Sequence, residues 1–299
     1  MQFQQTLKDR YTFDGKGLHI GKIARMTVGP APVNTGIVFR RTDVGEDALV
    51  AALAENVSNT ARSTTISKNG VSVSTIEHIM SALTGLGVDN ALIDIDNVEV
   101  PILDGSARPY IEAMFKDGVV VQDQPRRYVE VEAPVEVVNE NGSVVRIEPA
   151  EEFSYEIKVD FNSRVLGVQT AAWNPSVIYE EQIGTCRTFV FFHELQFLFA
   201  NNLVKGGDVD NAIVIVEHPV TDEQVQQMSE LFNVPALKVR EDGYLSNLTL
   251  RFPNECARHK LLDLIGDLRL AGGFLKAKVT AEKPGHSINT AAALKLRQQ

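Results

Sequence analysis

Alternating apolar and polar residues predict short strands in both halves of the chain. The alternation falls on residues 26–31 and 36–40 in the first half, and on residues 144–150 and 155–160 in the second. A period of two residues is typical of strands with one buried face. A polar stretch containing a proline, at residues 122–127, separates the two halves. We therefore expect a domain boundary within that stretch.

Each half also contains a helix with apolar residues at helical spacing. The apolar stripe comprises Ile76, Ile79, Met80 and Leu83 in the first helix, and Leu261, Leu264, Ile265 and Leu268 in the second. His78 lies roughly opposite the first stripe, and His259 and Asp263 lie roughly opposite the second. If each stripe packs on its own sheet, these three polar side chains face the other half of the molecule.

The order of features is similar in the two halves. In each, the helix carries a histidine followed seven positions later by a glycine, then a strand and a loop. The strands are expected at residues 91–96 and 274–279, and the second loop contains His286. We interpret this as a duplicated α+β unit, with domains 1–124 and 125–299 packed helix layer to helix layer. A site formed by both helices would lie at their interface.

The second half contains additional residues, which we expect to form an inserted element near residues 190–222. Five phenylalanines lie at its start: Phe189, Phe191, Phe192, Phe197 and Phe199. This cluster is consistent with either a hydrophobic core or the wall of an apolar channel, because ligand sites are mostly lined by apolar and aromatic side chains.

Composition narrows the class of protein. The 299 residues are 44% hydrophobic and 23% charged, with a net charge of −10, which argues against nucleic acid as a partner. We find no apolar run of about 18 residues that could span a bilayer, and no secretory pattern at the start. The two cysteines, Cys186 and Cys256, are too few for a disulfide framework. We therefore expect a cytoplasmic protein without membrane insertion, and a monomer, since no coiled-coil heptads occur.

The polar residues opposite the two stripes suggest a metal site. His259 and Asp263 are four residues apart, so both can bind one ion from the same helix face. His78 is a third candidate ligand, and Glu77 places a carboxylate beside it. Catalytic zinc sites use three protein ligands and leave a fourth position for water. The pattern predicts a metal hydrolase.

Other interpretations of these residues remain open. Ser74 and Glu77 fit a capping box, in which Glu77 only starts a helix. His259 and Asp263 could be a surface pair, and the chain could be a metal-free binding or scaffold protein. Another zinc enzyme acting on an amide is a further alternative. The order of ligands does not match the His-Glu-x-x-His pattern of most metalloproteases.

Several short motifs together resemble one family. They are GLH at 17–19, STIEH at 74–78, DGS at 104–106, RTF at 187–189, RHKLLDLIGD at 258–267 and KPGH at 283–286. The chain is similar over nearly its whole length to the bacterial UDP-3-O-acyl-N-acetylglucosamine deacetylases, which are zinc amidases of lipid A synthesis. Some members carry a fused dehydratase domain, which the residues after Leu296 do not indicate.

The resemblance implies roles for the candidate residues. His78, His259 and Asp263 would bind one Zn²⁺, which activates water and polarises the acetamide carbonyl. Glu77 would be the general base. Zinc, Thr188 and Lys260 would stabilise the oxyanion. His286, oriented by Asp267, would protonate the leaving amine or stabilise the oxyanion electrostatically.

The resemblance also implies substrate contacts. The substrate would be UDP-3-O-(3-hydroxyacyl)-N-acetylglucosamine, a UDP-linked acylated amino sugar. Residues 190–222 would form the acyl-chain passage, with Phe189 and Gly207 as contacts. The nucleotide contacts would be His19, Asp160, Phe161 and Lys283, although Asp160 and Phe161 could simply end a strand and Lys283 could be a surface lysine.

Overall fold

The first of two five-stranded sheets lies in the N-terminal half. The structure is a computed structural model that describes residues 2–200 and 205–299. The strand order is β2 (Tyr11–Lys16), β3 (Ile23–Pro30), β9 (Ala91–Ile95), β4 (Ile37–Arg41) and β5 (Leu49–Ala51). The β4–β9 pair is parallel, and the other pairs are antiparallel. Buried and exposed residues alternate along β3, as expected for a sheet with one covered face.

The second sheet repeats this arrangement in the C-terminal half. Its order is β12 (Val135–Val138), β13 (Val144–Pro149), β19 (Ala277–Glu282), β14 (Ser154–Asp160) and β15 (Val168–Trp173). Again the third and fourth strands in the order, β19 and β14, are parallel and the remaining pairs are antiparallel. The identical topology confirms the predicted α+β fold of two similar sheet-plus-helix units.

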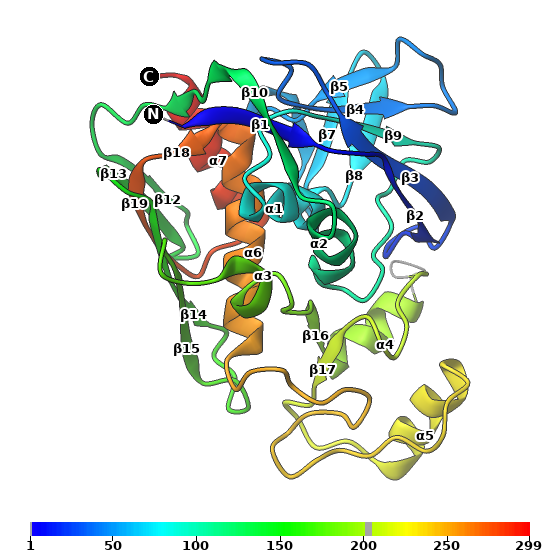
Figure 1. The fold of residues 1–299 in the computed structure, drawn as a ribbon. Coiled ribbons are helices and arrows are strands. Elements are labelled where there is room, and N and C mark those ends of the chain that lie inside the picture. The colour runs from blue at the N-terminus through cyan, green and yellow to red at the C-terminus, as the bar shows by residue number, and fades with distance from the viewer. Residues whose placement is uncertain (1, 201–204) are drawn as a thin grey trace.

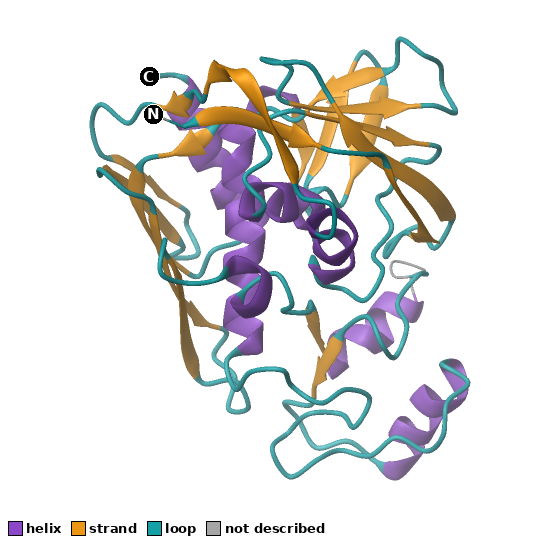
Figure 2. Ribbon diagram, viewed as in Figure 1, coloured by secondary structure: helices purple, strands orange, loops and turns teal. Residues whose placement is uncertain are grey.

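Helices fill the space between the two sheets (Figure 2). The helices that carry the histidines, α1 (Glu77–Gly85) and α6 (Glu255–Leu268), pack against each other near the middle of the molecule (Figure 1). Each is followed by a strand and a second helix, α2 (Arg108–Phe115) in the first unit and α7 (His286–Arg297) in the second. The predicted helix-to-helix packing of the two units is therefore confirmed.

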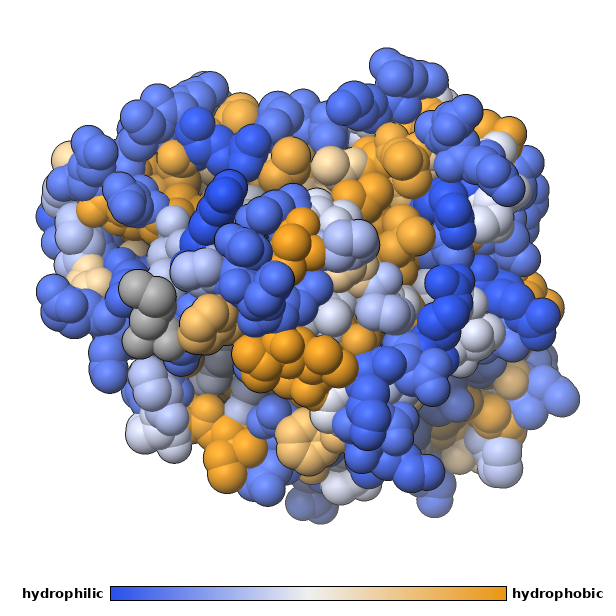
Figure 3. Space-filling model, turned by 45° about the horizontal axis from the view of Figure 1, so that its top comes forward, coloured by the Kyte–Doolittle hydropathy of each residue, from blue (hydrophilic) through white to orange (hydrophobic). Residues whose placement is uncertain are grey.

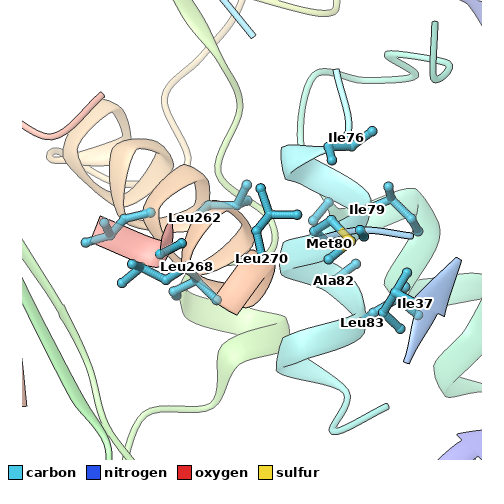
Figure 4. Close-up of a cluster of buried hydrophobic side chains, with 14 of the residues drawn as sticks. Ile37, Ile76, Ile79, Met80, Ala82, Leu83, Leu262, Leu268 and Leu270 are labelled. Carbon is cyan, nitrogen blue, oxygen red and sulfur yellow. The ribbon is translucent and has the colours of Figure 1, made fainter. Parts of the chain in front are cut away.

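The core extends across this helix layer. The predicted stripe of α1 is fully buried, and Leu83 lies beside Ile37 of β4, while Leu262 and Leu268 of α6 approach from the other unit (Figure 4). Burying one such side chain contributes about 1.5–3 kcal/mol. Because α1 lies between its own sheet and α6, Glu77 and His78 are buried as well. These two polar residues therefore sit within a largely apolar interior.

Shorter elements pair within each unit. β1 (Phe3–Leu7) pairs with β10 (Val119–Pro125), and β11 (Tyr128–Val129) pairs with β18 (Phe274–Leu275). A three-stranded sheet comprises β6 (Val57–Asn59), β7 (Thr65–Lys68) and β8 (Val71–Ser74), and short 3-10 turns cover Ala54–Asn56 and Arg269–Ala271. The boundary expected after residue 124 falls at the end of β10, and it stays a prediction.

Two expectations about the second unit require correction. The strand expected at residues 274–279 is divided, because β18 bonds to β11 whereas β19 bonds to β13 and β14. His286 is not in a loop: it is the first residue of α7, with Gly285 as the N-cap. Alternation along the chain does not specify hydrogen-bonding partners, so it could not show that the strand is divided. The proline and glycine before His286 indicated a loop, but Gly285 is the N-cap of a helix.

The inserted element expected near residues 190–222 stays a prediction. α4 (Phe192–Ala200) and β17 (Ile213–Ile215) lie within this range, β16 (Phe189–Phe191) lies at its start and α5 (Asp222–Leu231) at its end, whereas α3 (Tyr179–Gln182) precedes it and packs in the main core. Phe192 and Leu195 pack with Val225 and Met228 of α5 and with Leu245, so the packed unit continues past residue 222. Residues 201–204 and the side chain of Phe199 lie outside the described residues.

The face drawn in Figure 3 is largely polar. Hydrophilic residues cover most of the face in Figure 3, and apolar residues gather in smaller patches between them. Within the described residues, no helix has the length and apolar character needed to cross a bilayer.

Candidate metal centre and catalytic cavity

Three polar side chains meet where α1 crosses α6. His78 is the second residue of α1, and His259 and Asp263 lie one turn apart on α6. One ligand atom from each lies within 4.8 Å of the others. Asp263 Oδ1 is 3.6 Å from His78 Nε2 and 3.4 Å from His259 Nε2. All three residues are buried, so the group lies at the interface of the two units.

The protonation states of these residues favour the binding of a cation. The backbone oxygen of Cys186 lies 3.1 Å from His259 Nδ1, which places the ring proton on Nδ1 and leaves the Nε2 lone pair facing Asp263. Burial lowers the pKa of His259 to about 3, so its imidazole is neutral. Asp263 Oδ1 is buried without a hydrogen-bond partner among the described residues. A carboxylate oxygen in that position is satisfied by a bound metal ion.

Lys260 also contacts Asp263, through the other carboxylate oxygen. Its Nζ lies 2.9 Å from Asp263 Oδ2. Burial works against the charged form of Asp263, but the ammonium group of Lys260 and a hydrogen bond with His78 help to hold its pKa well below the usual range. Burial likewise opposes the charge on Lys260, and the Asp263 carboxylate more than compensates, so the Lys260 pKa is raised. The ammonium group therefore stays charged at the edge of the metal centre.

Glu77 and His286 face each other beside the metal centre. Glu77 Oε1 lies 3.9 Å from His286 Nε2, and His286 Nδ1 lies 2.9 Å from Asp267 Oδ2. Burial raises the pKa of Glu77, against the opposing effect of His286 and His78. Burial alone would lower the pKa of His286, but the carboxylates of Asp267 and Glu77 raise it to about 9. The pair therefore combines a carboxylate with raised proton affinity and a protonated imidazole.

The capping role considered for Glu77 is wrong. The N-cap of α1 is Ile76, and no side chain of the described residues caps it. Ser74 ends β8 and donates its hydroxyl to the Val98 carbonyl at 3.3 Å. The Glu77 carboxylate instead accepts a hydrogen bond from the Thr64 backbone N–H at 3.0 Å, which points it into the interface.

These groups line one side of a cavity of about 250 Å³. Its walls include Glu77, His78, His259, Lys260, Asp263 and His286, together with Thr188, Phe189 and Phe161. The Thr188 backbone N–H donates to the Gly105 carbonyl at 2.8 Å, which fixes the segment carrying Thr188 against the first unit. Asp267 lies behind His286, fully buried.

A second cavity of about 110 Å³ adjoins the first. The two share Leu18, Arg62, Thr188, Phe189 and Val190 as lining residues. The second continues into the inserted element, between Leu195, Leu198, Val214, Phe232 and Leu245. His19 and Gly207 line this second cavity rather than the first. Of the phenylalanines expected as core or channel wall, Phe192 is buried in a core and Phe189 and Phe191 line the first cavity, whereas Phe197 is 58% exposed.

The remaining predicted residues lie outside the two cavities or at their rim. Phe161 is 40% exposed and contacts the rings of Phe189 and Phe191, at the edge of the first cavity. Asp160 and Lys283 line neither cavity, and their charged groups lie 3.9 Å apart. A larger cavity, of about 930 Å³, lies around Trp173 and is lined by none of the predicted site residues. Cavity size alone therefore does not identify the candidate active site.

Arg62 and Thr64 are among the residues at the site that were not expected from the sequence. Arg62 lines both cavities with a left-handed backbone, at φ 67°, and Thr64 contacts Glu77 and Asp267. Both lie in the irregular segment between β6 and β7. Neither belongs to a motif or to a periodic pattern, so nothing in the local sequence distinguished them.

The fold and the site together define a duplicated α+β protein in which two histidines and one aspartate form a buried candidate metal centre, beside a carboxylate–imidazole pair. The chain belongs to the UDP-3-O-acyl N-acetylglycosamine deacetylase family, whose profile matches residues 4–234 and 230–298. This confirms the resemblance found in the sequence.

Relatives of two kinds match the chain. It is 44% identical to the bifunctional enzyme LpxC/FabZ of Porphyromonas gingivalis, covering 100% of this chain and 65% of the relative. It is 40% identical to the enzyme of the same name from Bacteroides thetaiotaomicron, covering 99% and 64%. It is 37% identical to the UDP-3-O-acyl-N-acetylglucosamine deacetylase of Saccharophagus degradans, covering 99% and 90%. The chain thus spans slightly less than two thirds of the length of these two bifunctional relatives.

Proposed function

We propose that this chain hydrolyses the acetamide of UDP-3-O-(3-hydroxyacyl)-N-acetylglucosamine, releasing acetate and the free glucosamine amine in an early step of lipid A biosynthesis. The observation that carries the proposal is the unpartnered Asp263 Oδ1 between the Nε2 atoms of His78 and His259, with the Glu77–His286 pair beside it. The substrate is inferred from the family and from the name of the Saccharophagus degradans relative.

His78, His259 and Asp263 would hold one Zn²⁺. When bound, the ion would lower the pKa of a water toward about 7 and polarise the amide carbonyl. The neutral imidazole of His259 and the ionised carboxylate of Asp263 are the protonation states that such ligands require. This donor set also accepts Fe²⁺ or Co²⁺, so the metal is to be tested directly.

Glu77 is the proposed general base. Its raised pKa favours accepting the proton of the attacking water, and its position next to His78 keeps it near the reacting atoms. The water oxygen bonds to the carbonyl carbon as Glu77 takes the proton, and the carbonyl electrons move onto oxygen. Thr188 and the charged Lys260, both in the wall of the cavity, would stabilise that negative charge.

His286 is the proposed proton donor. With a pKa of about 9 its imidazole is protonated at neutral pH, so it can protonate the nitrogen as the carbon–nitrogen bond breaks. The positive charge of His286 would also stabilise the oxyanion. Asp267, through the 2.9 Å contact with Nδ1, would keep Nε2 directed toward the cavity.

The substrate would extend from this cavity in two directions. The apolar second cavity, with Phe189, Gly207 and His19 in its wall, suits the acyl chain. The exposed Phe161 ring at the rim of the first cavity suits a planar base, and Lys283 near Asp160 supplies positive charge for the diphosphate. Local positive charge is needed there because the chain as a whole carries a charge of −10.

We further infer a monomer in the cytoplasm. Cys186 and Cys256 are both free and buried, which fits a reducing compartment. Sedimentation of the purified protein tests the oligomeric state.

The test is acetate release from the proposed substrate, measured with and without a chelator. We expect chelation to abolish release and Zn²⁺ to restore it, with Fe²⁺ and Co²⁺ compared in parallel. Glu77→Gln is the matched control for contaminating activity, since it should bind metal and release almost no acetate. A folded, zinc-loaded protein that releases no acetate would refute this substrate and favour the alternative, deacetylation of another amide.

A further inference from the structure

Thr64, just before β7 (Thr65–Lys68), makes three hydrogen bonds with the catalytic surroundings. Its hydroxyl donates to Asp267 Oδ1 at 2.6 Å. Its backbone N–H donates to Glu77 Oε2 at 3.0 Å, and its carbonyl accepts from the Ile76 N–H at 3.3 Å. Thr64 has no exposed surface, so water cannot substitute for these partners without a change in packing.

The hydroxyl of Thr64 determines how Asp267 can be oriented. Asp267 is fully buried and its Oδ2 accepts from His286 Nδ1 at 2.9 Å and from Asn289 Nδ2 at 3.0 Å. Oδ1 accepts from Thr64, on the other side of the carboxylate. With donors on both oxygens the carboxylate plane is held, and the imidazole that it contacts is held with it.

The contacts form a closed ring of four residues. Thr64 bonds to Glu77 and to Asp267, Asp267 bonds to His286, and His286 Nε2 returns to Glu77 Oε1 at 3.9 Å. Thr64 and Glu77 belong to the first unit, whereas Asp267 and His286 belong to the second. One residue therefore sets the base and the proton donor relative to each other across the interface of the units.

We propose that Thr64 is a positioning residue for the hydrolysis, one whose hydroxyl fixes the Asp267–His286 pair relative to Glu77. The inference rests on the proposed function. The backbone of Thr64 holds Glu77 independently of its side chain, so the two contributions can be separated by substitution. Thr64→Val keeps the backbone contacts and the shape of the side chain but removes the donor to Asp267. Thr64→Ser keeps the donor and removes only a methyl group.

Thr64→Val should lower kcat about 10- to 100-fold, as is typical when the partner that orients a functional side chain is lost. KM and the bound metal should stay at wild-type values, because neither the cavity wall nor a ligand changes. Thr64→Ser should restore kcat to within a few-fold of wild type. If Thr64→Val fails to fold, as judged by its circular dichroism, Thr64→Ala is measured against the same criteria.

A double-mutant cycle with His286→Gln separates positioning from general structural support. If Thr64 acts through His286, Thr64→Val should have little further effect on kcat once His286 has been replaced. An equal loss in both backgrounds would overturn the proposal, as would wild-type kcat in Thr64→Val. Absence of acetate release from the metal-loaded wild type would instead refute the proposed function, so the two failures are distinguishable.

Discussion

Gly266 of α6 lies directly against the backbone of Glu77 in α1. A Cβ on Gly266 would stand 2.1 Å from the Glu77 carbonyl oxygen and 3.1 Å from the Ser81 nitrogen. The absence of a side chain allows the two helices to approach more closely than larger residues permit. This approach brings His78 within reach of the Asp263 carboxylate, so one glycine connects the packing of the units to the geometry of the metal centre.

Gly266→Ala should therefore weaken both folding and metal binding. Overpacking of this kind typically costs about 1–3 kcal/mol, and here it would separate the ligands on α1 from those on α6. Urea denaturation measures the stability, and competition with a chelator measures the metal affinity. Gly142→Ala is the control: nothing lies within 4 Å of its added Cβ, so only its turn is strained and metal affinity should not change. Wild-type metal affinity in Gly266→Ala would show that the close approach is unnecessary.

Replacement of Glu77 by glutamine should separate metal binding from catalysis. The amide keeps the size of the side chain but cannot accept the proton of water, so kcat should fall by about 10² to 10⁴ while metal content is retained. His78→Ala, its neighbour, should lose the metal itself. Metal analysis and acetate release measured on both variants check this. Near-normal turnover by Glu77→Gln would contradict the assignment of the base.

The pH dependence of kcat should have an alkaline limb that belongs to His286. The protonated form is the proposed donor and its pKa is about 9, so activity should decline as the pH rises through that value. On the acidic side, activity should decline as Glu77 is protonated, at a pH above the usual range for glutamate because burial raises its pKa. Profiles of wild type and His286→Gln test this, and an alkaline limb unchanged in the variant would refute the assignment.

Metal removal should lower the melting temperature. A metal ion would satisfy the buried Asp263 Oδ1, so we expect it to bind the folded chain in preference to the unfolded one. At a free metal concentration 100 times Kd this contributes about 2.7 kcal/mol. Calorimetry of metal-free and Zn²⁺-loaded protein measures the shift. Asp263→Asn should show little shift, and an equal shift in that variant would mean that the metal stabilises the chain elsewhere.

The buried pair of Arg187 and Glu255 should contribute strongly to stability. Glu255 is fully buried and accepts from Arg187 Nε at 2.9 Å and from the Arg251 backbone at 2.6 Å. Loss of one partner from a buried pair typically costs about 3–5 kcal/mol because the other charge stays buried. Arg187→Met should show this loss in chemical denaturation, whereas Arg146→Met, at an exposed pair, should remain close to wild type. Similar values for both variants would contradict the prediction.

Several parts of the fold and site could be predicted because they depend on residues near one another in the chain. The strands β13 and β14 follow from alternation over a few residues, and His259 and Asp263 share a helix face because of their spacing. The repeated order of features also indicated the duplicated unit. Arg62 and Thr64 could not be predicted, since they lie in irregular backbone where no periodicity applies.

The sequence by itself determined the two α+β units, the helix that carries His259 and Asp263, and the family to which the chain belongs. Only the tertiary structure decided that Glu77 faces His286 rather than capping α1, that His286 begins α7, and that Thr64 reaches Asp267 in the other unit. The physical reason is the range of the interactions. Local periodicity reflects backbone geometry over a few residues, whereas contacts between distant residues depend on how whole helices and sheets pack.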